Sequence, residues 1–253
     1  MPVCQVTPAI VLRTWPFGES DKIVSFLTET HGKLRGIAKG AKRSRKRFVN
    51  SLEPFSLVNI SFQDRSHSQL VFVLASELLL GSKTLIDSLE KIAFASYLVE
   101  ITDGLIGERE ENPLVFQHLR DGLLYLEKRS VSLAFVTSFE LKLLRLAGYQ
   151  PSLAGCKRCG KASSSLKSWH FSPRDGGILC DFCSRLRKEI FPVSGAELEI
   201  LTKLQEEENI ASFENSPPSM ILKKLRSLVI RFIQFHMERE IKSVAFLQKV
   251  SLF

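Results

Sequence analysis

The sequence of 253 residues lacks features that mark several well-known classes of protein. No apolar run approaches the ~18 to 20 residues that a membrane-spanning helix needs. The N-terminal segment MPVCQVTPAIVL has no positive charge before its short apolar run and no small-residue cleavage site, so we expect no secretory signal. Internal repeats and low-complexity tracts are also absent from the sequence. We therefore expect a soluble, cytoplasmic protein without a membrane partner.

Catalytic motifs are missing as well. The sequence has no Gly-x-x-x-x-Gly-Lys phosphate loop, no Gly-x-Gly-x-x-Gly, no Gly-x-Ser-x-Gly and no His-Glu-x-x-His. The histidines are scattered, and the basic region described below contains no clustered acids that would hold a nuclease metal. We therefore predict a protein that is not an enzyme.

Cysteine is scarce, and an odd total of five argues against a disulfide framework. Four of the five form two Cys-x-x-Cys pairs with twenty residues between them: Cys156, Cys159, Cys180 and Cys183. This spacing is typical of four thiolates around one tetrahedral Zn²⁺, and Gly160 allows the positive φ that such turns need. Cys4 stands alone, and we expect it to be buried in the first strand.

The predicted zinc is structural. Four protein ligands fill a tetrahedral shell, whereas a catalytic zinc keeps one position open for water. The His-x-Glu and Pro-Cys-x-x-Cys signature of nucleobase deaminases is absent. His170 lies between the two pairs but would be a surplus ligand, so we expect a solvent-facing or hydrogen-bonded histidine.

The positive charge is concentrated in one part of the chain. The formal net charge is +8, from 35 Lys and Arg against 27 Asp and Glu, and eight of the cations lie in an acid-free window at residues 33–47. We expect residues 33–39 to form a strand with its cations on one face, and residues 40–47 to form a mobile loop. Crowded like charges favour the binding of a polyanion. If ~6 phosphates of single-stranded DNA are neutralised, the slope of log binding affinity against log salt concentration is about −4. Phe48 and Phe55 flank the window and can stack on bases or, as we favour, pack in the core.

Hydrophobic periodicity separates a β part from an α part. Strands are predicted at residues 3–14, 23–28, 33–39, 57–62 and 69–74, which suits a small barrel of the OB or SH3-like type. Helices are predicted at residues 85–101, 114–128, 131–146, 194–207 and 219–237, the second capped by Asn112 and Pro113. The expected fold is therefore α+β and multidomain: a barrel, then a helical bundle with an inserted Cys4 zinc finger.

Four segments in this order resemble the bacterial RecO family of recombination mediators: GESDK (residues 18–22), GKLRGIAKGA (32–41), LEPF (52–55) and ELL (77–79). The resemblance runs through essentially the whole chain. It implies an OB-fold at residues 1–80, a helical domain at 81–152 and 191–253, and a zinc module at 153–190. It also implies binding of single- and double-stranded DNA, strand annealing, and partnership with RecR and single-stranded DNA-binding protein (SSB) during RecA loading in the nucleoid.

The residues that would carry these activities can be named as hypotheses. DNA binding is assigned to the eight cations of the basic window, Lys33, Arg35, Lys39, Lys42, Arg43, Arg45, Lys46 and Arg47. Docking of the acidic, apolar C-terminal tail of SSB needs a cation at the rim of an apolar groove, and helical placement makes Arg120, Lys142 and Arg145 the candidates. The alternative outside this family is an RNA-binding or ribosome-associated zinc-ribbon protein, because phosphate contacts do not identify the polymer.

Overall fold

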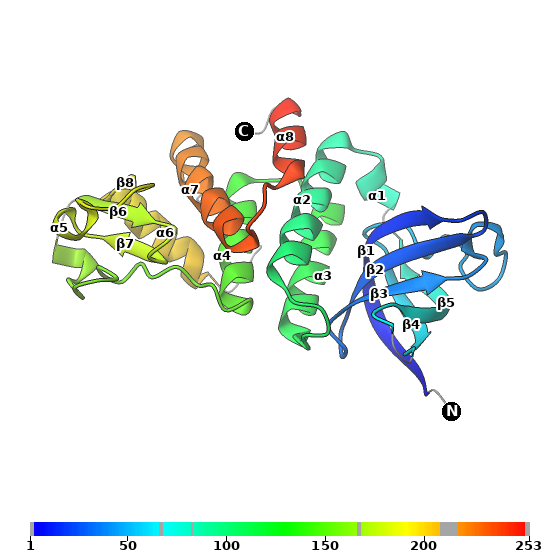
Figure 1. Ribbon diagram of the computed structural model, residues 1–253. Helices are drawn as coiled ribbons and strands as arrows, with labels where there is room; N and C mark the ends of the chain where they lie inside the picture. Colours follow the sequence, from blue (N-terminus) through cyan, green and yellow to red (C-terminus); the bar gives the residue numbers. More distant parts are fainter. Residues whose placement is uncertain (1–2, 66–67, 82, 166–167, 208–216, 251–253) are drawn as a thin grey trace. The chain divides into compact units, whose positions relative to one another are not determined.

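The computed structural model describes residues 3–65, 68–81, 83–165, 168–207 and 217–250 (Figure 1). The chain forms two compact units, Met1–Arg129 and Ser130–Phe253, and each is described separately below. Among the described residues, no helix combines the length and the apolar character needed to cross a membrane.

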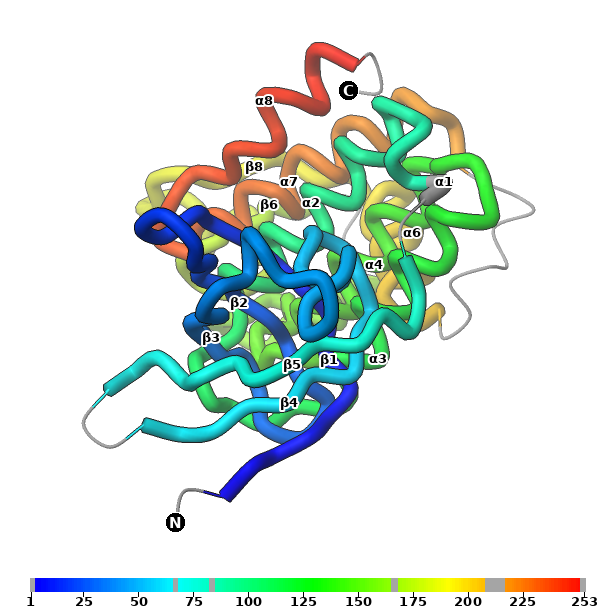
Figure 2. Tube along the Cα trace, turned by 90° about the vertical axis from the view of Figure 1, so that its right-hand side faces the viewer, coloured from blue at the N-terminus to red at the C-terminus, as the bar shows by residue number. Residues whose placement is uncertain are grey.

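The first unit begins with a closed five-stranded barrel. Its strands are β1 (Cys4–Phe17), β2 (Asp21–Thr28), β3 (Lys33–Ala38), β4 (Leu57–Gln63) and β5 (Val71–Leu80). They follow the order β1-β2-β3-β5-β4, and β1 also pairs with β4 to close the sheet (Figure 2). Only the β3–β5 pairing among them is parallel. Periodicity could not separate an OB-fold from an SH3-like barrel, but this strand order is that of an OB-fold.

The barrel interior is filled by alternate residues of each strand. Gly36 faces inward, and a Cβ atom at this position would lie 2.6 Å from Val73 Cγ2, so a larger residue would displace this side chain. Phe48 is buried in the same core, which confirms the packing role favoured for it. The remaining core residues include Ala9, Val11, Val24, Phe26, Leu34, Ala38, Val58, Ile60, Phe62 and Val71.

Both long strands differ from the prediction. β1 continues through Pro16 to Phe17, where it pairs with β2 but not with β4, and proline is tolerated in a strand that has one free edge. β5 extends to Leu80, paired with Leu57 of β4. The expected burial of Cys4 is wrong: its side chain is exposed, because the start of β1 pairs with β4 alone and lies beyond the end of β2.

In the described part of the first unit, the barrel is followed by the helices α1 (Lys83–Ile86), α2 (Leu89–Leu105) and α3 (Pro113–Lys128). The single helix expected at residues 85–101 is divided, because Ser88 adopts an extended conformation and caps α2 by accepting a hydrogen bond from the N–H of Lys91. The predicted cap of α3 is confirmed, since Asn112 Oδ1 accepts from the N–H of Val115 at 3.1 Å.

The second unit combines helices with a small sheet. The longer helices are α4 (Leu133–Leu146), α6 (Gly195–Glu206), α7 (Ser219–Met237) and α8 (Lys242–Lys249). The sheet has the order β7-β6-β8, from β6 (Ser168–Ser172), β7 (Gly177–Leu179) and β8 (Phe191–Ser194). Neither this sheet nor α8 was predicted, because strands of three to five residues leave little periodicity to detect.

Candidate metal centre and nucleic-acid surface

The four paired cysteines meet at one point in the second unit. Their sulfur atoms all lie within 4.8 Å of one another, and the Sγ atoms of Cys159 and Cys180 are 3.8 Å apart. A tetrahedron with metal–sulfur bonds of ~2.3 Å has edges of about 3.8 Å, so the spacing fits one four-coordinate ion. The four thiols can therefore hold a single metal ion.

Local backbone structure places both pairs. The first pair lies on a tight turn in which the N–H of Gly160 donates to the carbonyl of Cys156 at 2.9 Å, and Gly160 has the expected positive φ of 74°. The second pair spans the junction where β7 ends and the short helix α5 (Asp181–Ser184) begins, with Cys180 at the helix cap. The N–H of Lys157 donates to the carbonyl of Ile178 and ties the turn to β7.

The environment favours the thiolate at Cys156 and disfavours it at Cys183. Burial disfavours ionisation of Cys156, but N–H groups of Cys159, Cys180 and Arg158 donate to its sulfur and lower its pKa to about 6. At Cys183, burial and the neighbouring sulfurs raise the pKa to about 12. Four thiolates this close repel one another unless a cation lies between them, which is the condition a metal ion satisfies.

His170 lies outside this cluster. It is on β6, and its Nδ1 is 3.4 Å from Asp181 Oδ1. His170, which we did not expect to be a ligand, is therefore a neighbour of the site, next to a carboxylate, and the candidate ligand set among the described residues consists of four cysteines.

The basic window in the first unit separates into two groups. Lys33 and Arg35 point outward from β3 and pair with acids that follow in the chain. Lys33 Nζ lies 3.3 Å from Asp103 Oδ1 and its side chain is only 10% exposed, while Arg35 pairs with Glu108 and remains exposed. Lys33 is therefore engaged in a buried ion pair and not presented to solvent.

The second group, residues 40–47, is called the basic segment here. It was expected to be a mobile loop, but it contains a 3-10 turn (Ala41–Arg43) and is anchored at both ends. Arg47 donates to the carbonyl of Lys39 at 2.8 Å, and its own carbonyl accepts from the N–H of Ser76 at 2.8 Å. The segment thus holds several exposed cations in a defined loop: Lys42, Arg43, Arg45, Lys46 and Arg47.

Sequence reasoning missed an aromatic residue that contacts Lys39, the residue just before the basic segment. Phe72 on β5 lies 5.2 Å from Lys39 Nζ and 4.4 Å from the Arg65 guanidinium, measured to the ring centroid. Arg65 belongs to the β4–β5 connection and was not among the predicted cations. Only the parallel β3–β5 pairing brings Phe72 next to Ile37 of β3, so no local pattern could have revealed the cluster.

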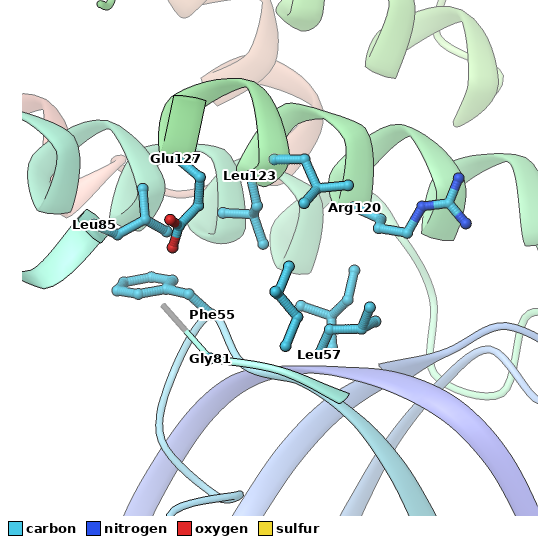
Figure 3. A pocket seen from close by; sticks show the side chains of 10 residues that line it. Phe55, Leu57, Gly81, Leu85, Arg120, Leu123 and Glu127 are labelled. Carbon is cyan, nitrogen blue, oxygen red and sulfur yellow. The ribbon is translucent and has the colours of Figure 1, made fainter. Parts of the chain in front are cut away.

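The predicted docking cations belong to two different units. Arg120 is on α3 in the first unit, whereas Lys142 and Arg145 are on α4 in the second. Arg120 borders an apolar pocket beneath α3, and Figure 3 shows its guanidinium at one end, directed away from Phe55. Glu127 lies near the Phe55 end of this pocket. The lining is otherwise apolar: Ile10, Phe55, Leu57, Leu80, Gly81, Leu85, Leu123 and Leu124.

Comparison with known proteins identifies the family. Sequence models described as "Recombination protein O N terminal" and "Recombination protein O C terminal" match residues 1–81 and 86–245. Relatives named "DNA repair protein RecO" include those of Myxococcus xanthus, 32% identical over 96% of this chain and 97% of the relative, and Syntrophus aciditrophicus, 30% identical over 96% and 95%. The chain belongs to the RecO family. Membership assigns it to DNA repair and recombination.

Two of the segments that resemble the RecO family contact each other in the barrel. Within GESDK, Asp21 Oδ1 accepts a hydrogen bond from the N–H of Gly40, and the carbonyl of Gly18 accepts one from Lys42 Nζ at 2.7 Å. The carbonyl of Ser20 also accepts from the N–H of Lys42. The RecO-like GESDK turn is therefore the support on which the basic segment rests.

Proposed function

We propose that the protein is a DNA repair and recombination mediator that binds single- and double-stranded DNA and anneals complementary strands. With RecR, it would help to load RecA onto SSB-coated DNA. The observation that carries the proposal is the basic segment, in which five cations are exposed on one anchored loop of the barrel. The mechanism needs no nucleotide hydrolysis and no catalytic residue.

The chemistry is electrostatic. Cations of the basic segment, with Lys39 and Arg35, neutralise phosphates of two strands at once and lower the repulsion that slows their pairing. Phosphate contacts carry no sequence information, so binding is largely independent of sequence. Lys33 would contribute indirectly: its ion pair with Asp103 holds the start of β3 in position.

We further propose that the metal is one structural zinc ion. The ligand set of four thiols supports zinc, and four protein ligands leave no coordination position for water. The ion would stabilise the segment around β6 and β7, whose short strands supply little core of their own.

The deciding experiment is annealing of complementary strands, bare and coated with SSB, by the wild type and a reversed variant. The variant carries Lys42→Glu, Arg43→Glu, Arg45→Glu and Lys46→Glu. A matched control carries Lys128→Glu, Lys203→Glu, Lys223→Glu and Lys249→Glu, all at exposed helical positions. Each reversal removes two charges, so either variant lowers the formal +8 to zero.

We expect the basic-segment variant to lose DNA binding and annealing, and the control to keep most of both. If both variants lost DNA binding equally, binding would depend on the net charge of the protein, which would contradict the proposed site. Competition between single-stranded DNA and RNA of one sequence tests the RNA-binding alternative, which tighter binding of RNA would support.

A second candidate function is docking of the SSB tail in the Arg120 pocket. The supporting observation is an apolar pocket with Arg120 at one end, where it pairs with the exposed Asp121 at 2.9 Å, and with Glu127 toward the other end. An acidic, apolar peptide would bind with its acids toward Arg120 and away from Glu127. Titration with the tail peptide should show weaker binding to Arg120→Glu and unchanged binding to Lys142→Glu and Arg145→Glu. Binding indifferent to Arg120 would dismiss this pocket.

A further inference from the structure

Four outward-facing side chains form one row across the barrel, called the outer row here. Cross-strand pairing links Trp15 to Ile23, Ile23 to Ile37 and Ile37 to Phe72, which connects β1, β2, β3 and β5. These side chains point away from the interior because their neighbours along the strands belong to the core, namely Val24, Ala38, Val71 and Val73.

The row has aromatic rings at its two ends. Trp15 is 41% exposed, and Phe17, two residues further along the same side of β1, is 50% exposed. Phe72 at the other end is half-buried; between the rings, Ile23 is half-buried and Ile37 is buried. Exposed rings on neighbouring strand positions are unusual on a monomer surface and indicate a ligand with an apolar face.

Cations border the outer row on both sides. On one side, Lys39 and Arg65 lie over Phe72, and the basic segment follows Lys39. On the other, Arg13 and Arg35 occupy the adjacent row of the sheet, both in register with Ser25, where they pair with Asp103 and Glu108. Rings next to Lys39, Arg65 and the exposed cations of the basic segment match a polymer with flat apolar groups and phosphates.

We propose that the outer row is a base-stacking platform, through which the barrel distinguishes unpaired strands from duplex DNA. This inference rests on the proposed function and deepens it. Bases of a single strand stack on Trp15 and Phe72, while Lys39 and Arg65 bind the phosphates between them. A base on Phe72 takes the place of the Arg65 guanidinium, which then reaches a phosphate. Duplex DNA offers no free base faces, so only its phosphates are bound.

The platform also has a consequence for annealing. Stacking occupies the face of a base and leaves its hydrogen-bonding edge open. Three interstrand spacings of ~4.8 Å separate β1 from β5, about 14 Å in all, which is enough for a few bases. A strand held in this way is extended and remains able to pair with a complementary strand that the basic segment brings near.

The chain contains its own reporter for the test. Of its two tryptophans, Trp169 is fully buried in the second unit, so a change of fluorescence on DNA binding reports chiefly on Trp15. We would titrate the protein with a thymine oligonucleotide and with an abasic oligonucleotide of equal length and charge. Quenching by the first and not by the second is expected, and Trp15→Phe should abolish the signal.

Affinity measurements complete the test. Trp15→Leu and Phe72→Leu should each weaken single-strand binding by roughly 5- to 100-fold without changing the salt slope, because no charge is lost. The affinity for duplex DNA should change by less than about 2-fold, so the assay must resolve a 2-fold change in affinity. Trp15→Phe retains a ring and should keep most of the affinity. Phe246→Leu, at an exposed aromatic position of α8, is the matched control.

Three results would overturn the inference. One is equal affinity for the abasic and the base-containing strand, together with wild-type affinity in Trp15→Leu and Phe72→Leu. Another is equal loss of single-strand and duplex binding in these variants. The third is quenching of Trp15 by anionic phospholipid vesicles that matches the quenching by DNA, which would assign the row to a membrane surface. If the basic-segment variant still lost DNA binding, the proposed function would survive; if it bound normally, the proposed function would fail first.

Discussion

Asp21 accepts a hydrogen bond from the backbone N–H of Gly40 at 2.8 Å and so joins the β1–β2 turn to the start of the basic segment. Gly40 has a φ of 69°, in the left-handed region where glycine is favoured. The Gly40 N–H, the Ser20 hydroxyl and the nearby charges of Lys39 and Lys42 lower the pKa of Asp21. One carboxylate thus orients a loop whose cations would otherwise repel one another.

Replacing Asp21 with Asn should loosen the basic segment, because a neutral amide accepts more weakly from the Gly40 N–H and no longer attracts Lys42. We expect faster trypsin cleavage within residues 42–47 and a several-fold loss of DNA affinity, on the order of one lost charge-assisted hydrogen bond. Limited proteolysis followed by mass spectrometry measures the first effect. Glu19→Gln, at the exposed neighbouring position, is the control and should behave as wild type.

The same contact predicts a pH dependence. Because folding lowers the pKa of Asp21 below its ordinary value of 3.8, its stabilising contribution is complete above that value and is lost as the pH falls through the folded-state pKa. The amide resonance of Gly40 should therefore shift in acid, with a midpoint below 3.8, in an NMR titration of the native protein. An unchanged Gly40 resonance, or the same shift in Asp21→Asn, would contradict the assignment.

Substitution of Lys46 should weaken DNA binding, whereas substitution of Lys33 should lower stability. Lys46→Gln removes an exposed cation, so the slope of log affinity against log salt should fall in magnitude by about 0.7 with little change in Tm. Lys33→Gln breaks a buried ion pair with Asp103, which should cost about 1 to 3 kcal/mol of stability and leave the salt slope unaltered. Salt titrations and urea unfolding measure the two quantities. A reduced slope in Lys33→Gln would show that Lys33 binds phosphate after all.

The purified protein should contain one zinc ion per chain, released by chelators with loss of structure in the second unit. Cys180→Ser should abolish stoichiometric zinc and expose the segment around β6 and β7 to proteolysis, because metal binding and local folding are coupled. DNA binding by the barrel should persist. Metal analysis and circular dichroism test this, with Cys4→Ser, at the exposed cysteine outside the cluster, as the control.

A buried ion pair between Arg226 of α7 and Glu140 of α4 offers a stability test. The Arg226 Nε to Glu140 Oε1 distance is 3.0 Å, and both side chains are almost completely buried. Removing one partner, as in Glu140→Leu or Arg226→Leu, should cost about 3 to 5 kcal/mol because a charge remains in the core. The double variant should be far less destabilised than the sum of the two. Urea unfolding measures the coupling, and additive losses would mean that the pair does not interact.

Much of the local structure was predictable. Alternation in the first 80 residues predicts the strands, and Asn112-Pro113 predicts the start of α3, because both signals act over a few residues. The break before α2 was missed because Ser88 interrupts an otherwise continuous apolar pattern. The short strands β6, β7 and β8 were missed because they depend on pairing between segments that carry little pattern alone.

The sequence by itself determined the family, the barrel and helix content, the four cysteines of the candidate metal centre and the position of the positive charge. Each of these depends on residue type and short spacing, which the linear chain already contains. Only the tertiary structure decided which cations are presented to solvent and what lies beside them. Lys33 is buried because Asp103, seventy residues away in the chain, folds against β3. Phe72 contacts Lys39 because β5 pairs in parallel with β3. Such contacts join residues far apart in the chain, so they form only when the whole barrel folds.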